Sequence, residues 1–164
     1  MHCDLPLSLE VKRQLTAGQK ILLSGMIYTA RDAAHKKIVE SLQNKQSLPF
    51  ELKDAVIFYA GPTPARENGL PGAIGPTTSS RMDPYTVPLL EAGISAVIGK
   101  GERAPEIMES MAKHDVVYFI AVGGIGALLA KCIRSMTCVA WPELGPEAVY
   151  RMEVKDFPVV VGMS

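Results

Sequence analysis

The residues best suited to chemistry lie in one polar stretch, GPTTSSRMDP, at residues 75–84. It places four hydroxyl side chains and Arg81 between a Gly-Pro pair and an Asp-Pro pair. Hydroxyl and guanidinium groups offer many hydrogen-bond donors, and a guanidinium can bind a carboxylate through two parallel bonds. Asp83 and Pro84 fit a helix N-cap and first helical residue, so we expect Arg81 and Thr77 at the positive end of a helix. The alternative is a turn whose hydroxyls bond their own backbone.

Two further cations fall where an anion could be bound. Arg31 lies in the first turn of a helix predicted over residues 31–44, where the helix dipole is positive and an acid is usual. Beside free backbone N–H groups it could bind a carboxylate or phosphate, although a surface arginine paired with Asp32 is the alternative. Lys100 follows a predicted strand inside GKG, at the kind of strand end where α/β proteins bind ligands. A solvated lysine in a glycine turn fits that pattern equally well.

The start of the same helix carries two more signals. The sequence TARD resembles a capping box, with Thr29 as the cap and Asp32 at the third helical position. His35 lies four residues after Arg31, hence on the same helical face, and could reach a site there. We favour a solvent-facing histidine.

Common ligand-binding motifs do not fit this sequence. The glycines around GKG lack the spacing of a P-loop, and Gly101 stands where that loop has Ser or Thr. The sequence GGIGALL, residues 123–129, lacks the last glycine of a dinucleotide fingerprint and is interpreted as a tight strand-to-helix turn. No C-x-x-C pair occurs among Cys3, Cys132 and Cys138, so we expect no metal bound by this chain alone.

Length, composition and charge predict one compact domain over residues 1–164. Hydrophobic residues make up 48% and charged residues 21%, as is typical of globular proteins. The formal net charge is zero, which argues against a nucleic-acid partner or an anionic membrane surface. The longest uncharged stretch, residues 116–130, is too short to span a membrane. With no secretory signal and no paired cysteines, we expect the chain in the cytoplasm.

Strand and helix patterns alternate outside the Gly- and Pro-rich loop at residues 61–76. Strands are predicted at residues 20–30, 54–60, 94–99, 116–122, 136–141 and 149–163, and helices at residues 31–44, 84–93, 102–115 and 125–134. The first and last strand segments could each hold one strand or two. Alternation with short connections is typical of parallel pairing in an α/β fold. Ala34 and Ile38 belong to an apolar stripe that places helix 31–44 on a sheet.

Five segments together resemble a known family: SGMIYTARDAAHKK, GPTTSSRMDPY, VIGKG, VGGIGALLAK and WPELGPEAVYRMEVKDFPVVV. They closely resemble the β subunit, or C-terminal domain, of iron–sulfur hydro-lyases of the class I fumarase and L-tartrate dehydratase family. The resemblance implies a swivelling β/β/α domain and the reversible trans addition of water to the double bond of a dicarboxylate. It also implies a 4Fe-4S cluster held by cysteines of a separate α subunit or N-terminal domain. The open iron of that cluster would act on the departing hydroxyl. The implied assembly is a homodimer or a heterotetramer that includes this α subunit.

The family's functional positions fall on residues already singled out. The resemblance places substrate-binding arginines at Arg31 and Arg81, the motif threonine at Thr77 and the strand-end lysine at Lys100, with Ser80 where many relatives have glycine. The three cations would neutralise a small dicarboxylate. Thr77 and Lys100 are the predicted catalytic residues, because nearby cations would make the Thr77 hydroxyl more acidic and suit it to proton transfer. Alternatively, Thr77 only positions the substrate and the partner supplies the base.

Three functions therefore remain open. The first is the β subunit of a fumarate hydratase, active only with its α subunit. The second is the β subunit of an L(+)-tartrate dehydratase, which performs the same chemistry on a substrate with one more hydroxyl. The third is a non-catalytic carboxylate-binding module.

Overall fold

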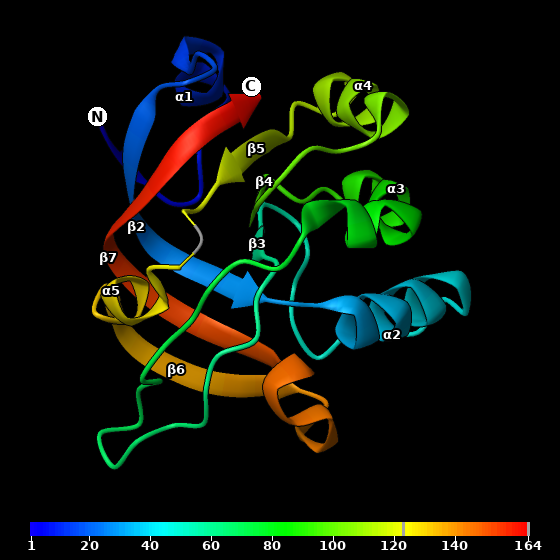
Figure 1. Ribbon diagram of the computed structural model, residues 1–164. Helices are drawn as coiled ribbons and strands as arrows, with labels where there is room; N and C mark the ends of the chain where they lie inside the picture. The colour runs from blue at the N-terminus through cyan, green and yellow to red at the C-terminus, as the bar shows by residue number, and fades with distance from the viewer. Residues whose placement is uncertain (123, 164) are drawn as a thin grey trace.

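Strands and helices alternate through the middle of the chain (Figure 1). The computed structural model describes residues 1–122 and 124–163, so Gly123 of the predicted strand-to-helix turn lies outside the described residues. The strands are β1 (His2–Asp4), β2 (Lys20–Thr29), β3 (Val56–Phe58), β4 (Ala96–Gly99), β5 (Val117–Ile120), β6 (Ile133–Ala140) and β7 (Val149–Met163). The helices are α1 (Leu9–Gln14), α2 (Asp32–Gln43), α3 (Asp83–Glu91), α4 (Pro105–Lys113) and α5 (Gly126–Ala130), with 3₁₀ helices η1 (Ser79–Met82) and η2 (Pro142–Glu147).

The sheet closes on itself through its last strand. Strands β2, β3, β4 and β5 pair in parallel and in chain order. Strand β7 runs antiparallel to both β5 and β2, which joins these five strands into a ring. Strand β1 pairs outside this ring with β2, and β6 pairs outside it with β7. Parallel pairing was thus the right prediction for β2 to β5 and the wrong one for β6. Strand β6 runs antiparallel to β7, because only η2 separates the two strands and so short a connection favours antiparallel pairing.

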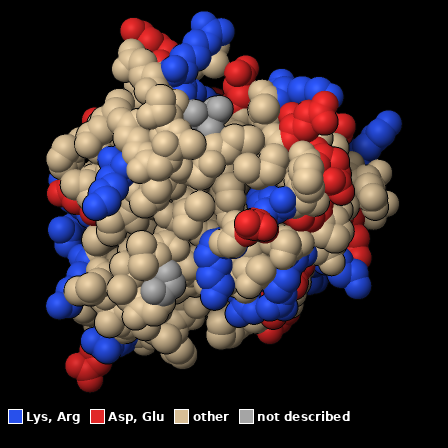
Figure 2. Space-filling view, turned by 45° about the horizontal axis from the view of Figure 1, so that its top comes forward, with Lys and Arg blue, Asp and Glu red and all other residues tan. Residues whose placement is uncertain are grey.

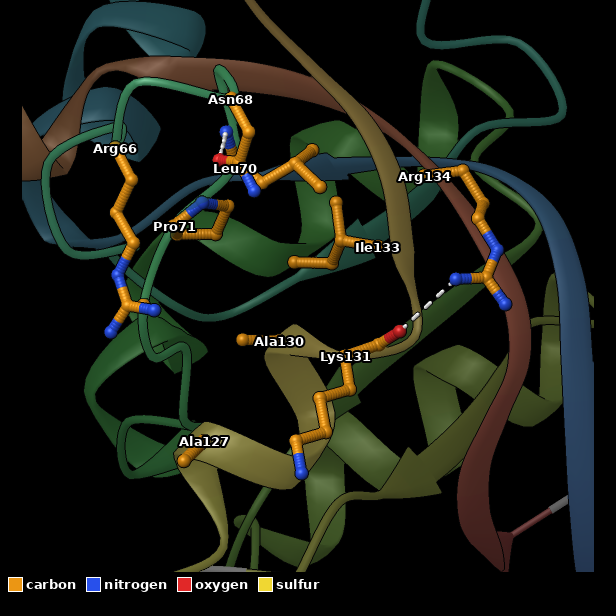
Figure 3. Close-up of a pocket in the computed structure, with 10 residues that line it drawn as sticks. Arg66, Asn68, Leu70, Pro71, Ala127, Ala130, Lys131, Ile133 and Arg134 are labelled. Carbon is orange, nitrogen blue, oxygen red and sulfur yellow. Dashed lines mark hydrogen bonds between the residues drawn. The ribbon is translucent and has the colours of Figure 1, made fainter.

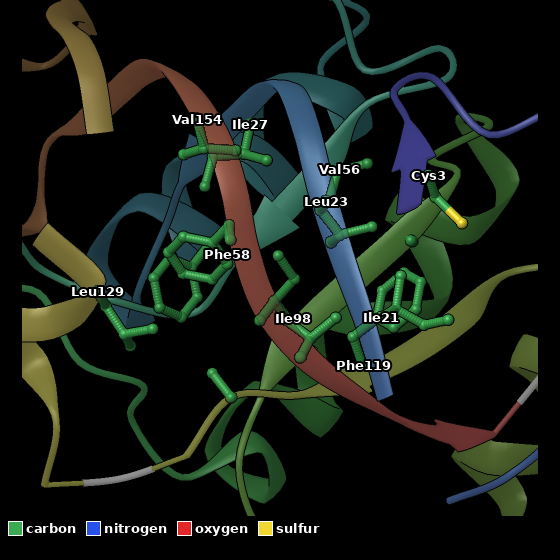
Figure 4. Close-up of a cluster of buried hydrophobic side chains, with 14 of the residues drawn as sticks. Cys3, Ile21, Leu23, Ile27, Val56, Phe58, Ile98, Phe119, Leu129 and Val154 are labelled. Atoms are coloured by element: carbon green, nitrogen blue, oxygen red, sulfur yellow. The ribbon is translucent and has the colours of Figure 1, made fainter. Parts of the chain in front are cut away.

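Strands β3, β4 and β5 are buried on both faces. In β3, Val56 and Phe58 point into the ring, whereas Ile57 points to the helices. The same alternation, with its period of two, runs through β4 and β5. Figure 4 shows the inner cluster between the strands, where Phe58, Ile98 and Phe119 meet side chains of β2 and β7. Because both faces are covered, these strands are continuously apolar in sequence.

Helices α2, α3 and α4 form the outer layer. In Figure 1 they lie side by side on one flank of β3, β4 and β5, with β2, β6 and β7 on the other, which gives β, β and α layers. The predicted single-domain α/β class is confirmed. The apolar stripe of α2 is confirmed as well, since Ala34 and Ile38 are buried. The helix predicted over residues 125–134 is shorter, because the chain from Ile133 onward pairs with β7 instead.

Charges of both signs lie in small groups on the surface. Figure 2 shows basic and acidic side chains bordering a largely uncharged central area on the face in view. This distribution agrees with the formal net charge of zero, so any anion must be bound by a local group of cations. No helix in the described part of the chain has the length and apolarity needed to cross a bilayer.

Candidate functional site

The polar loop at residues 75–84 is fastened to the ends of two neighbouring strands. The Thr77 backbone N–H donates to the carbonyl of Tyr59, directly after β3, at 2.7 Å. The Ser79 N–H donates to the Lys100 carbonyl at 2.9 Å, and the Lys100 N–H returns a bond to Ser79 Oγ at 3.0 Å. Thr77 and Lys100, 23 positions apart in sequence, therefore sit on adjoining backbone at the carboxyl ends of β3 and β4. This is the edge of a parallel sheet at which ligands bind.

Ser79 does not form the self-contained turn considered as the alternative for this loop. Its hydroxyl is buried and donates to the Tyr118 hydroxyl at 2.9 Å, because the single proton of Tyr118 is donated to the Gly101 carbonyl at 2.7 Å. Gly99 permits this close approach, because a Cβ atom at that position would collide with Ser79 Oγ and with the Tyr59 ring. The Thr77 hydroxyl has no hydrogen-bond partner among the residues that the structure describes, which leaves it available to a ligand.

Arg81 joins this loop to the first turn of α2. Its Nε and Nη2 atoms lie 3.1 and 2.9 Å from the same carboxylate oxygen, Asp32 Oδ2. The side chain of Arg81 is half exposed, at 52%. The neighbouring Arg31 occupies the N-cap position of α2, and its stem packs against the loop start, where a Cβ atom at Gly61 would lie 3.3 Å from Arg31 Cδ. The four predicted site residues are thus carried by segments that contact one another.

Both predicted helix caps are wrong. Thr29 Oγ1 accepts a hydrogen bond from the Tyr150 N–H of β7 at 3.1 Å, and α2 begins only after Arg31. The free Ala33 N–H of that helix is bonded by Glu147 Oε1 at 3.3 Å instead. Asp83 is the first residue of α3 and not its cap. In both cases the predicted capping side chain forms a hydrogen bond with a residue distant in sequence, and not with the start of its own helix.

His35 is buried, so the predicted solvent-facing position is also wrong. The ring packs between Tyr59 and Tyr85, and Nδ1 lies 2.8 Å from the Arg31 carbonyl. Because a carbonyl only accepts, Nδ1 carries the proton and Nε2 is left as an acceptor. Burial lowers the pKa of His35 to about 4, from an ordinary value of 6.5. The imidazole is therefore neutral at physiological pH.

The first turn of α2 holds an unusual group of unsatisfied polar atoms. Arg31 Nε, Asp32 Oδ1 and His35 Nε2 are all buried and have no hydrogen-bond partner among the described residues. Buried polar groups in native proteins are nearly always bonded to protein or to ordered water. A ligand, water or partner chain bound at this helix end would supply the missing contacts.

Sequence reasoning missed Arg103, whose side chain is fully buried behind the site. Its Nε donates to Asp83 Oδ1 at 2.8 Å, Nη1 to the Tyr59 hydroxyl at 2.9 Å and Nη2 to Thr86 Oγ1 at 2.7 Å. Its guanidinium also lies over the rings of Tyr59 and Tyr118. Burial alone would lower the pKa of Arg103, but Tyr59 and Asp83 outweigh burial and raise it. The only sequence signal was a charged residue preceding Ala-Pro at a helix start.

A separate surface hollow lies between the loop at residues 61–76 and α5. It measures about 290 Å³ and has Arg66, Lys131 and Arg134 on its rim (Figure 3). Arg134 bonds the Lys131 carbonyl at 3.3 Å, and none of the predicted site residues lines this hollow. In the described ranges, 1–122 and 124–163, no group of three or more His, Cys, Asp or Glu side chains is placed to hold a metal ion.

Known proteins resemble this chain over almost its whole length. Residues 3–164 match the family described as Fumarase C-terminus. Fumarate hydratase 2 of Leishmania major is 40% identical over 158 residues, covering 93% of this chain and 28% of that protein. Fumarate hydratase class I, aerobic, of Escherichia coli (strain K12) is 39% identical over 150 residues, covering 90% of this chain and 27% of that protein. The putative L(+)-tartrate dehydratase subunit beta of Methanocaldococcus jannaschii is 41% identical over 158 residues, covering 93% of this chain and 81% of that protein.

The chain spans little more than a quarter of the two fumarate hydratases, but most of the tartrate dehydratase subunit. The predicted resemblance is confirmed, because the family match extends over nearly every residue of the chain. The chain therefore belongs to the Fumarase C-terminus family.

Proposed function

We propose that this chain is the β subunit of a fumarate hydratase and provides the dicarboxylate-binding half of an active site shared with an α subunit. One observation carries the proposal. The contacts Arg81–Asp32 and Ser79–Lys100 gather three cation-bearing segments, distant in sequence, at the same strand ends. A site for a small dianion needs such cations and little apolar surface. We further propose that the complex works in the cytoplasm.

The iron–sulfur cluster implied by the family does not fit the cysteines of this chain. Cys3 is buried in β1, Cys132 lies between α5 and β6, and Cys138 is exposed on β6. We assign the 4Fe-4S cluster to the α subunit, which would correspond to the larger part of the fumarate hydratases that this chain does not span. A homodimer or a heterotetramer is the expected assembly.

This chain's own contribution is to bind the substrate and to move a proton. Arg81 has guanidinium N–H groups free to bind one carboxylate, and the buried Arg31 Nε–H has no other acceptor among the described residues. In the dehydration direction, Thr77 Oγ1, as the alkoxide, would take the proton from the carbon next to the one that carries the departing hydroxyl. The electron pair of that C–H bond would form the carbon–carbon double bond, and the neighbouring C–O bond would break to release hydroxide. The ammonium of Lys100 would stabilise the negative charge on Thr77 Oγ1. Because the Thr77 hydroxyl has no partner among the described residues, it is free to face the substrate.

A tartrate dehydratase is the second candidate. The similar subunit of Methanocaldococcus jannaschii favours it, since that protein is nearly matched in length by this chain. The two substrates differ by one hydroxyl, so the same cations would serve both. A chain that never joins a partner would instead be a carboxylate-binding module.

Coexpression of the chain with the α subunit of its native host, under anaerobic conditions, tests the proposal. The purified complex is assayed with malate, fumarate and both tartrate enantiomers. We expect turnover of malate and fumarate, whereas turnover of tartrate alone would favour the second candidate. If affinity purification from the native host recovers no partner, the shared-site proposal fails.

Arg81→Ala tests the site within that complex. We expect kcat/KM to fall by about 100-fold or more, because a bidentate contact to a substrate carboxylate is lost. Arg13→Ala, which removes an exposed arginine on α1, is the matched control and should leave kcat/KM unchanged. Equal kinetics for the two variants would remove Arg81 from the site.

A further inference from the structure

The contact between Arg81 and Asp32 uses only one edge of the guanidinium. Nε and Nη2 both donate to Asp32 Oδ2, at 3.1 and 2.9 Å. A guanidinium carries five N–H groups in a plane, so one N–H of Nη2 and both of Nη1 remain. The edge formed by Nη1 and Nη2 still offers two parallel donors. A second carboxylate can therefore bind Arg81 bidentately while Asp32 stays in place.

Asp32 is better fixed than the arginine that it holds. It is the first residue of α2, where the positive end of the helix stabilises a carboxylate. Its side chain is 32% exposed, against 52% for Arg81, and its Oδ1 atom is buried. Arg81 belongs to the four-residue helix η1 and has a long, flexible stem. Without a counterion the guanidinium would sample several rotamers, so Asp32 reduces the freedom of Arg81.

We propose that Asp32 is a positioning residue, which holds Arg81 by one edge so that the Nη1–Nη2 edge meets a substrate carboxylate. The inference rests on the proposed function, because it assigns Arg81 to the substrate. It explains why an acid follows Arg31 directly in the sequence. From this position Asp32 orients Arg81, the second predicted substrate-binding arginine. The bond between positions 32 and 81 spans 49 residues, so it also fixes the loop to α2.

A double-mutant cycle in the reconstituted complex tests this role. Asp32→Asn keeps the shape of the side chain and removes its charge, and we expect kcat/KM to fall by about tenfold, mostly through a higher KM. In an Arg81→Ala background, the same substitution should change kcat/KM by less than about twofold, because no guanidinium is left to orient. Asp4→Asn, on the exposed Asp4 of β1, is the control and should have no effect in either background. Thermal unfolding of each variant separates kinetic effects from loss of folded protein.

The outcomes separate the role of Asp32 from the assignment of Arg81 to the substrate. Equal losses for Asp32→Asn in both backgrounds would mean that Asp32 acts without Arg81, and the inference would be overturned. Wild-type kinetics for Asp32→Asn would overturn it as well. If Arg81→Ala itself leaves kcat/KM unchanged, the assignment of Arg81 to the substrate fails, and the proposed site fails with it.

Discussion

Replacing Asp83 with asparagine should strongly destabilise the fold, because it leaves the buried charge of Arg103 without a counterion. The side chains of Arg103 and Asp83 are 0% and 15% exposed, and their closest atoms are 2.8 Å apart. The remaining partners of Arg103 are neutral: the hydroxyls of Tyr59 and Thr86 and the thioether sulfur of Met111. Breaking a buried ion pair by removing one partner costs roughly 3–5 kcal/mol. That is a large share of the roughly 5–15 kcal/mol that stabilises a typical domain.

The geometry explains why an isosteric amide cannot replace this carboxylate. Asp83 accepts from Arg103 Nε on one oxygen and from the Ala104 N–H on the other, at 2.8 and 3.1 Å. An asparagine must turn its NH₂ group toward one of these two donors. For a chain of this length, we expect the melting temperature to fall by about 10 °C and the urea midpoint to fall in proportion.

Urea unfolding of the purified chain, followed by circular dichroism, measures the effect. Glu109→Gln is the matched control, since Glu109 pairs with Lys113 at 2.9 Å while both side chains are about 70% exposed. An exposed pair of this kind contributes at most about 1 kcal/mol. If Asp83→Asn costs no more than Glu109→Gln, the ion pair between Arg103 and Asp83 does not stabilise the fold.

Three further predictions concern the site. Gly99→Ala should cost at least about 2 kcal/mol in urea unfolding, because the new Cβ meets the polar loop, whereas Gly75→Ala, with open space around it, should cost far less. Since burial lowers the pKa of His35 to about 4, the unfolded chain takes up a proton first as the pH falls below about 6.5. The folded state should then lose about 2 kcal/mol between pH 7 and pH 5 through this group. Urea titrations should show that loss removed by His35→Asn and kept by exposed His114→Asn. Arg31→Lys should lower kcat/KM of the complex about tenfold, because an ammonium cannot replace a planar guanidinium, and equal activity would indicate a surface role.

Local patterns in the sequence predicted the framework well. The apolar runs that became β3, β4 and β5 are buried on both faces, and the stripe on α2 faces the sheet. These signals depend on neighbours within one or two turns, so a single sequence carries them. The same reasoning located the polar loop before α3 and Lys100 directly after β4. The roles of these residues in substrate binding remain predictions.

Partners far apart in sequence explain what the patterns missed. The caps failed because Thr29 bonds Tyr150 across 121 residues and the N–H of Ala33 bonds a carboxylate 114 residues away. The burial of His35 depends on Tyr59, which follows a different strand. The antiparallel return of β7 depends on pairing with both ends of the parallel set. None of these contacts leaves a pattern in the neighbouring sequence. Predictions based on local sequence patterns therefore could not include them.

The buried hydrogen-bond network around Arg103 supports the loop segment that carries Arg81. Ser79 is bonded to Tyr118, whose ring lies 5.7 Å from the Arg103 guanidinium, and Arg103 in turn bonds Asp83. The segment between Ser79 and Asp83 is therefore held at both ends by buried groups, while Arg81 on its outer side stays half exposed. Such support fixes the backbone before any ligand binds, so less ordering would remain if the loop binds a dianion as proposed. A rigid base with exposed binding groups is what a chain needs if a second subunit is to close over it.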